Sequence, residues 1–170
     1  MDNAVIHCKN SGLVLLNSYI LMLFNRLELT ENDKFKDAIA QQKAVLSLQY
    51  IATGQANSIN EHLNLNKVLC GLPLSTTINS GITFSSNEIE QMNGLLSAMI
   101  SYWKEIGETS IDGFRGNWLI RDGILKEDSE KWDITVERRA YDVLLNYAPF
   151  SFSMIKLPWM LKPLKVTWLK

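Results

Sequence analysis

The last third of the chain alternates hydrophobic and polar positions, which predicts a small β-sheet with a short helix beside it. From Trp132 to Glu137 every second residue is apolar, as in a strand with one buried face. The apolar residues of Ala140–Tyr147 follow a helical period instead. Two more alternating stretches, residues 150–154 and Leu164–Trp168, predict two more strands. Between Met154 and Ile155 the alternation slips by one position, so we expect either a bulge or a strand buried on both faces.

The N-terminal part of the chain has helical rather than strand periodicity. Residues 13–27 are apolar on nearly all sides, which predicts a helix in the middle of the domain. The residues Thr30–Asp33 have the composition of a helix cap, and they predict a second helix from Phe35 to about Thr53. Gly54 follows this segment in the place of a left-handed C-cap.

Two further capping boxes divide the next segment. Ser58 with Glu61 predicts the start of a third helix that ends near Cys70. Residues 73–84 have no helical period and read as a loop. Ser85 with Glu88 predicts the start of the most regular helix, whose apolar stripe continues to Ile106.

The order of these elements predicts an α+β fold: an N-terminal bundle of about five helices, then a small C-terminal β-sheet with one short helix. Ser110–Ile120 supplies the last helix of the bundle, and Ile124–Lys126 forms a hairpin with the strand at Trp132. A short strand is also expected at Ala4–His7. We expect residues 1–170 to form a single globular domain, helical over about 12–121 and sheet-forming over about 124–169.

Composition and charge narrow the class of protein. The 170 residues are 46% hydrophobic and 21% charged, with a net charge of −1 and a sequence pI near 6.1. A net charge this close to zero predicts no basic surface that would bind nucleic acid. The most hydrophobic run, residues 13–24, contains Asn17 and Ser18 and is shorter than the about 20 apolar residues that span a bilayer, so we expect no direct membrane insertion. We read a reduced, cytoplasmic site of synthesis, because two cysteines cannot make a disulfide framework.

Residues with catalytic potential are few and do not form a recognisable motif. Each of the two histidines has a cysteine nearby in the sequence: Cys8 follows His7, and Cys70 follows His62. Their spacing matches no zinc motif, and Cys70 falls on the apolar side of its helix. Nucleotide-binding, nucleophile-elbow and zinc-protease motifs are absent from the sequence. We therefore expect no catalytic residue, metal or cofactor, and a binding protein rather than an enzyme.

Two groups of residues are candidates for partner contact. Arg138 and Arg139 lie between a strand and a helix, where they either form structural ion pairs with nearby acids or offer guanidinium groups to a partner carboxylate. Trp159, Met160 and Trp168 are of types enriched in interface cores, but such residues also build domain cores. The exposed members of these two groups are the predicted contact residues.

Several blocks of the sequence resemble the contractile injection system tape measure protein family. They occur in the family's order and cover nearly the whole chain from Asn10 onward. The blocks are NSGLVLL at 10–16, LQYIATG at 48–54, LNLNKVLCGLPL at 63–74, TSIDGFRGNWLIRDG at 109–123 and WDITVERRAYDVLLNYAPFSFSMIKLPWM at 132–160. The most specific signal is VERRAYDVLL followed by IKLPWM, both within the last block.

The resemblance implies a non-catalytic component of a phage-tail-like contractile particle that touches inner tube, spike or baseplate proteins. It implies a cytoplasmic location during assembly and a place in a released or membrane-docked particle afterwards. The blocks resemble the C-terminal region of longer family members. A compact domain of this size has a radius of gyration of about 15 Å, and a single helix would reach only about 255 Å, so we do not expect the chain to be a long ruler. The alternative is a soluble adaptor or chaperone that binds effector or baseplate proteins of the same machinery.

Overall fold

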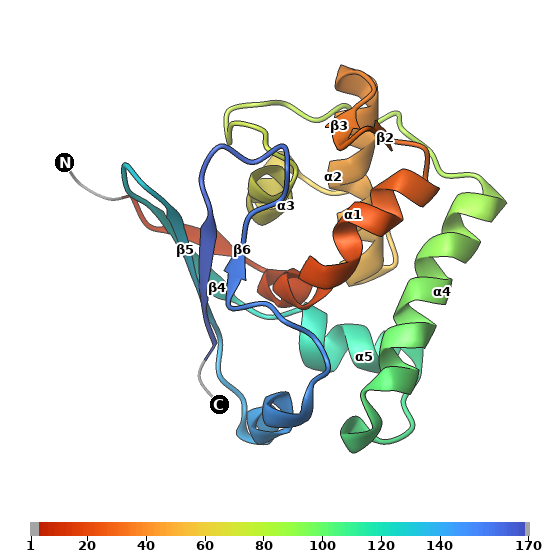
Figure 1. Cartoon of the computed structure of the whole chain (residues 1–170), viewed down its shortest axis with the longest axis vertical. Coiled ribbons are helices and arrows are strands. Elements are labelled where there is room, and N and C mark those ends of the chain that lie inside the picture. Colours follow the sequence, from red (N-terminus) through yellow and green to blue (C-terminus); the bar gives the residue numbers. More distant parts are fainter. Residues whose placement is uncertain (1–3, 169–170) are drawn as a thin grey trace.

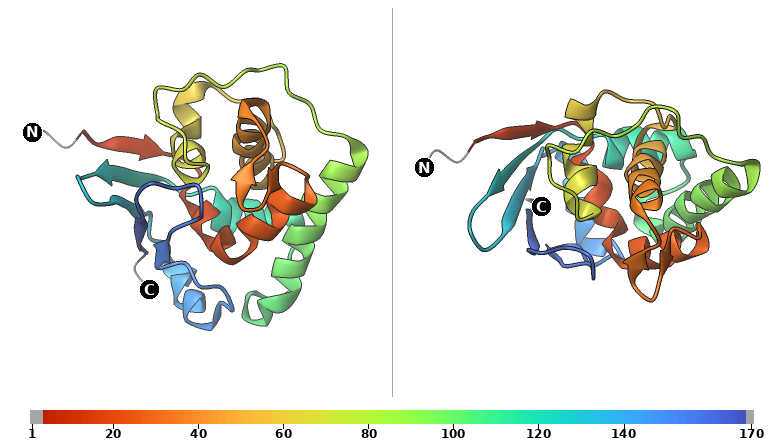
Figure 2. Two further views of the ribbon diagram at one scale, coloured as in Figure 1. Left: turned by 45° about the horizontal axis from the view of Figure 1, so that its top comes forward. Right: turned by 90° about the horizontal axis from the view of Figure 1, so that it is seen from above.

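The computed structural model describes residues 4–168 and has the α+β architecture that the sequence predicts. Helices gather on one side of a mixed five-stranded sheet, and the long helix α4 lies farthest from that sheet (Figure 1). Turning the molecule shows the N-terminal strand beside the β4–β5 hairpin at one margin of the sheet (Figure 2). No helix within residues 4–168 is both long and apolar enough to cross a membrane.

The helix predicted over residues 13–27 is present, but it consists of two segments of different helix type. The 3-10 helix η1 (Ser11–Leu16) has every residue buried, and it continues into α1 (Asn17–Arg26). Helix α1 buries one face and leaves Leu21 and Met22 exposed. The apolar run therefore sits in the middle of the molecule over η1, whereas α1 has a solvent-facing side.

The cap predicted at Thr30–Asp33 is wrong, because these residues turn a short hairpin instead of starting a helix. Strands β2 (Thr30–Glu31) and β3 (Lys34–Phe35) pair around Asn32 and Asp33, whose φ angles are 52° and 63°. Asn and Asp tolerate this left-handed conformation, which a two-residue hairpin turn requires.

Helix α2 (Ala38–Thr53) begins later than predicted and ends as predicted. Asp37 caps its start by accepting a hydrogen bond of 2.7 Å from the backbone N–H of Ala40. Gly54 has the expected left-handed conformation, with φ at 81°, and its N–H donates to Tyr50 O.

The next helices confirm one capping box and contradict the other. The 3-10 helix η2 (Asn60–Leu63) has Ile59 as N-cap, without a side-chain bond, so the box predicted at Ser58 is wrong. Helix α3 (Asn64–Leu69) ends at Cys70 as predicted. After residues 72–85, which form neither helix nor strand, Ser85 and Glu88 make both bonds of a capping box at the start of α4 (Ser86–Tyr102).

The segment predicted as one helix from Ser110 to Ile120 contains two kinds of helix. Ser110 caps α5 (Ile111–Phe114), which runs into the π-helical turn η4 (Arg115–Leu119). The stripe expected to continue α4 to Ile106 is completed by the 3-10 helix η3 (Lys104–Ile106) after a break at Trp103.

The sheet has strand order β1-β4-β5-β7-β6, and its strands are β1 (Ile6–Cys8), β4 (Gly123–Glu127), β5 (Trp132–Val136), β6 (Met154–Ile155) and β7 (Leu164–Thr167). The predicted hairpin of β4 and β5 is confirmed, and β5 pairs with β7 in parallel. The 3-10 helix η5 (Ala140–Tyr147) takes the place of the short helix predicted there.

One face of the sheet is buried and the other faces solvent. Leu125, Ile134 and Val166 lie side by side on the buried face, which packs on η1. Ser153 and Met154 are both exposed while Ile155 is fully buried, so the alternation does slip here. Because Met154 is exposed, the expectation of a strand buried on both faces is wrong.

Candidate contact site and its polar network

A buried ion pair joins the end of the π-helical turn to helix η5. Arg121 Nη2 lies 2.7 Å from Asp142 Oδ1, and the side chains of both residues are almost completely buried. Arg121 is also held among three aromatic rings, those of Trp118, Tyr141 and Trp168. A charge pair this far from water is stable only when each partner is fully matched, so neither residue can be lost without exposing the other's charge to an apolar core.

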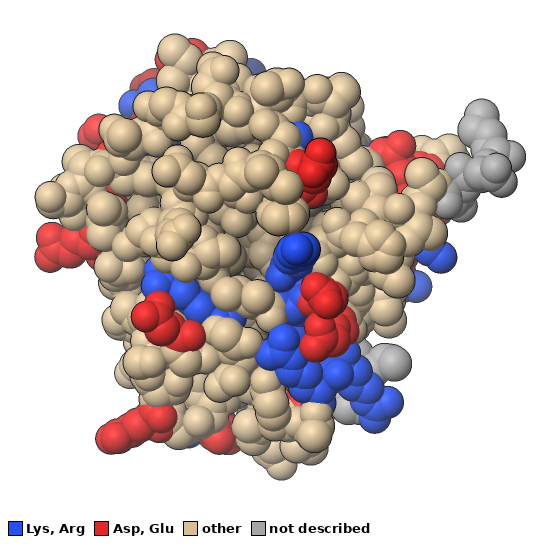
Figure 3. Space-filling model, turned by 180° about the vertical axis from the view of Figure 1, so that it is seen from behind, with Lys and Arg blue, Asp and Glu red and all other residues tan. Residues whose placement is uncertain are grey.

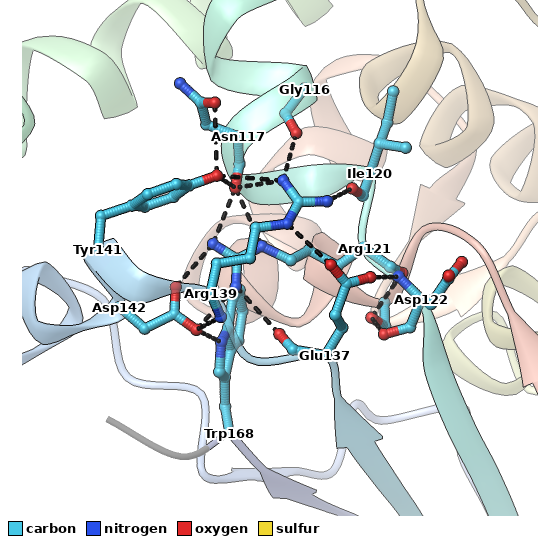
Figure 4. Close-up of polar contacts among 11 residues, drawn as sticks. Gly116, Asn117, Ile120, Arg121, Asp122, Glu137, Arg139, Tyr141, Asp142 and Trp168 are labelled. Atoms are coloured by element: carbon cyan, nitrogen blue, oxygen red, sulfur yellow. Dashed lines mark hydrogen bonds and ion pairs between the residues drawn. The ribbon is translucent and has the colours of Figure 1, made fainter.

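Asp142 accepts hydrogen bonds from several directions (Figure 4). The indole Nε1 of Trp168 and the backbone N–H of Arg139 both donate to Oδ2 at 3.0 Å. Burial alone would raise the pKa of Asp142, but the bonds from Arg121, Arg139 and Trp168 outweigh it and hold the pKa below its usual value. Asp142 is therefore a structural carboxylate, ionised at neutral pH.

Arg139 bonds to groups inside the molecule while part of its side chain remains accessible. Its guanidinium donates to the backbone carbonyls of Gly116 at 2.8 Å and Ile120 at 2.9 Å, and to the Glu137 carboxylate at 2.9 Å (Figure 4). These carbonyls belong to the end of the π-helical turn, where the helix provides no N–H partner of its own. Arg139 thus replaces the missing donors and ties η4 to the start of η5.

Arg138 differs from its neighbour, because its side chain is exposed. Within residues 4–168 no hydrogen bond or ion pair is formed by the Arg138 side chain. On the face opposite to that of Figure 1, basic and acidic side chains gather in one large mixed cluster, and smaller charged groups lie elsewhere on the same face (Figure 3).

The aromatic candidates are mostly part of the interior. Met160 and Trp168 are buried, with 4% and 6% of their surfaces exposed. Trp159 is half-buried: its Nε1 donates to Leu69 O at 2.7 Å, and its ring packs on those of Phe24 and Phe35. The sequence predicted partner contact only for those candidates that are exposed. Arg138 meets this condition and stays a candidate. Arg139 and Trp159 are partly accessible, although both also make internal bonds.

Sequence reasoning missed a second polar cluster in the core. Asn10 Nδ2 donates to Asn66 Oδ1 at 2.7 Å and to Gln49 Oε1 at 3.1 Å. Arg115, also buried, donates to the carbonyls of Ile51 and Tyr50 near the end of α2. Hydrophobic periodicity could not find these residues, because it assigns a polar residue to the exposed face. The only sequence signal for their importance was indirect: each lies in a block that resembles the family.

Both cysteines are buried. Burial raises the pKa of the Cys8 thiol to about 11 and that of Cys70 well above its usual value. A nucleophilic cysteine needs the opposite shift. Across residues 4–168, no three His, Cys, Asp or Glu side chains are grouped so that they could hold a metal ion. His7 is exposed and His62 is half-buried.

A hollow with a volume of about 730 Å³ lies between α1 and α4. Its charged lining residues are Arg26 and Glu90, and Gly94 and Ala98 line it as well.

Comparison with known proteins identifies one family. The model of the contractile injection system tape measure protein family matches residues 2–168, nearly the whole chain. No curated protein and no solved structure matches.

Proposed function

Because the chain belongs to the contractile injection system tape measure protein family, we propose that it is a non-catalytic assembly component of a phage-tail-like contractile particle. More specifically, it corresponds to the globular C-terminal domain of the tape measure component. The family match over residues 2–168 is the observation that carries this proposal.

The use of the polar motif residues supports an assembly role. Arg121, Arg139 and Asp142, which an enzyme could have used for chemistry, are bonded to backbone carbonyls and to one another. The two thiols are buried and their pKa values are raised.

We propose that the partners are inner tube, spike or baseplate proteins, and that Arg138 contributes to that contact. A free guanidinium on the surface binds a partner carboxylate in a two-pronged geometry that lysine cannot reproduce. Arg139 positions this region through its bonds to η4 and contributes only through its accessible edge. The chain is made in the cytoplasm and remains in the assembled particle.

The test is quantitative mass spectrometry of sheathed particles purified from the source cell. A few copies of the chain in each particle, together with tube and baseplate proteins, would support the structural role. Absence from particles combined with a soluble complex with effectors would favour the adaptor or chaperone alternative and overturn the proposal.

A charge reversal tests the contact residue. Arg138→Glu should lower the number of copies in each particle without changing the melting temperature, because the side chain makes no internal bond that the structure describes. Arg26→Glu is the matched control, since Arg26 is another exposed arginine, at the end of α1. Equal incorporation of the Arg138→Glu chain and the wild type would remove Arg138 from the contact.

A further inference from the structure

The segment between α3 and α4 packs on the helical part without forming a helix or a strand of its own. Residues 72–84, which we call the strap, are the yellow-green segment that runs from α3 past α2 to α4 (Figure 2). Within residues 4–168, the strap takes part in two hydrogen bonds between backbone groups, from the N–H of Leu72 to Lys67 O and from the N–H of Thr76 to Pro73 O. Its further polar attachments therefore come from side chains of the helical part.

Two of these side chains hold the middle of the strap. The backbone N–H of Ile78 donates to Asn60 Oδ1 at 2.8 Å, and that of Asn79 donates to Gln42 Oε1 at 3.0 Å. The Ile78 side chain is buried, whereas the other large apolar side chains of the strap are only partly buried: Leu72, Leu74, Ile82 and Phe84. A segment with few backbone bonds and little buried surface opens at a lower free energy than the whole fold unfolds.

Lys67, on α3, is buried where the strap begins. Only 2% of its surface is exposed, and its Nζ donates to Leu74 O in the strap at 3.2 Å. Among residues 4–168, no carboxylate lies close enough to Lys67 to form an ion pair. An ammonium group has three donors, so one carbonyl oxygen matches this buried group only in part.

The closed strap and the charge of Lys67 oppose each other. Burial lowers the pKa of Lys67, which means that the protonated amine is less stable beneath the closed strap than in water. When the strap opens, water reaches the amine and this cost is removed. The amine therefore favours the open state, whereas the burial of Ile78 favours the closed one.

We propose that the strap opens as a unit while the rest of the fold stays closed, and that the buried amine of Lys67 promotes this opening. The open state exposes the amine and the apolar side chains that the strap covers, so the protein has a second surface that its closed state hides. The inference concerns the chain by itself and does not depend on the proposed function.

Amide hydrogen exchange of the whole chain, followed by NMR, tests the first part. The amides of Thr76, Ile78 and Asn79 each donate a hydrogen bond in the closed strap. If the strap opens as a unit, these three amides should share one opening free energy, and it should lie below that of Leu48, which is fully buried in α2. Three different values, or a common value equal to that of Leu48, would overturn the proposal.

A substitution of Lys67 tests the second part. Lys67→Met should slow the exchange of all three strap amides severalfold, because an apolar side chain of similar length leaves no charge to be buried. Lys104→Met, which changes an exposed lysine in η3 in the same way, should leave them unchanged. Unchanged or faster strap exchange in Lys67→Met would mean that the amine does not promote opening, and would overturn its proposed role.

A second variant tests cooperativity without changing the charge. Ile78→Ala should accelerate the exchange of all three strap amides by roughly thirtyfold or more, the effect expected when a buried isoleucine is truncated. Acceleration confined to the Ile78 amide would show that the strap does not open as a unit.

Discussion

At the scale of single residues, arginines act as connectors between segments far apart in sequence. Arg115 reaches the carbonyls at the end of α2, Arg121 reaches Asp142 in η5, and Arg139 reaches back to η4. Each guanidinium has several donors in a rigid plane, so it can satisfy carbonyl groups that helix ends leave without partners. The blocks that identify the family therefore carry the contacts that hold the fold together.

Breaking the buried pair should be strongly destabilising. Asp142→Asn keeps the size of the side chain but leaves the Arg121 charge buried without an anion, which we expect to cost about 3–5 kcal/mol of unfolding free energy. Asp112→Asn is the control, because Asp112 pairs with Arg115 while 89% exposed. It should cost under about 1 kcal/mol. Urea denaturation of the two variants measures both values, and equal losses would contradict the structural weight given to the buried pair.

The same carboxylate predicts how stability depends on pH. The pKa of Asp142 is lowered by folding, so its contribution is complete above the unfolded value of about 3.9 and is lost as pH falls through the lower folded value. Stability should therefore drop steeply below about pH 4. In Asp142→Asn this drop should be shallower. Unfolding free energies between about pH 2.5 and pH 7 measure it, and parallel curves for the two proteins would refute this assignment.

How much of the site the sequence could predict depended on the type of residue. The sequence left two alternatives open for Arg138 and Arg139, because which arginine turns inward depends on the position of the π-helical turn, and no local pattern reveals that position. The sequence could not place Trp159 and Trp168, because a tryptophan has a large apolar ring and one polar N–H and therefore suits both a core and an interface. In the structure each indole N–H donates an internal hydrogen bond. Asn10 and Asn66 were missed because a buried polar residue has no periodic signature.

At the scale of elements, prediction succeeded where the local signal and the packing agreed. The Ser85–Glu88 capping box, the Gly54 cap and the β4–β5 hairpin are set by neighbouring residues and appear as expected. The Thr30–Asp33 cap failed because the same residue types also favour a tight hairpin turn, and tertiary packing chose between them. The Ser58 box failed because its helix starts two residues later, at Asn60.

A glycine in η1 shows how closely these elements approach. A Cβ atom on Gly12 would lie 1.7 Å from the carbonyl oxygen of Trp118, which is backbone and cannot rotate away. We expect Gly12→Ala to destabilise the protein by at least about 3 kcal/mol or to prevent folding. Gly94→Ala, at an open position on α4, should instead stabilise it by about 0.5–1 kcal/mol. Thermal unfolding measures both variants, and a tolerated Gly12→Ala would mean that η1 and η4 are packed less closely than the structure has them.

At the scale of the whole molecule, the order of the elements along the sequence did not show which strands pair with one another. Helices do precede most of the strands, but β1 comes from the N-terminus and pairs with β4, and β7 inserts between β5 and β6. Alternation identifies strands without naming their partners, because register and strand order depend on contacts distant in sequence. The chain therefore crosses between the helical part and the sheet part: β1 joins the C-terminal strands, and Trp159 reaches back to Leu69 in α3.

This crossing predicts that the helical part cannot fold alone. A fragment of residues 1–121 would lose the partner of β1, the carboxylate that matches Arg121 and the Trp159 contact with Leu69. It should lack a cooperative transition, whereas the whole chain should unfold in a single step, as we propose for one domain. Circular dichroism and tryptophan fluorescence followed in urea give the comparison, with coincident curves expected for the whole chain. Two separated transitions, or a stably folded fragment, would show that the helices form an independent core and that the sheet is an addition to it.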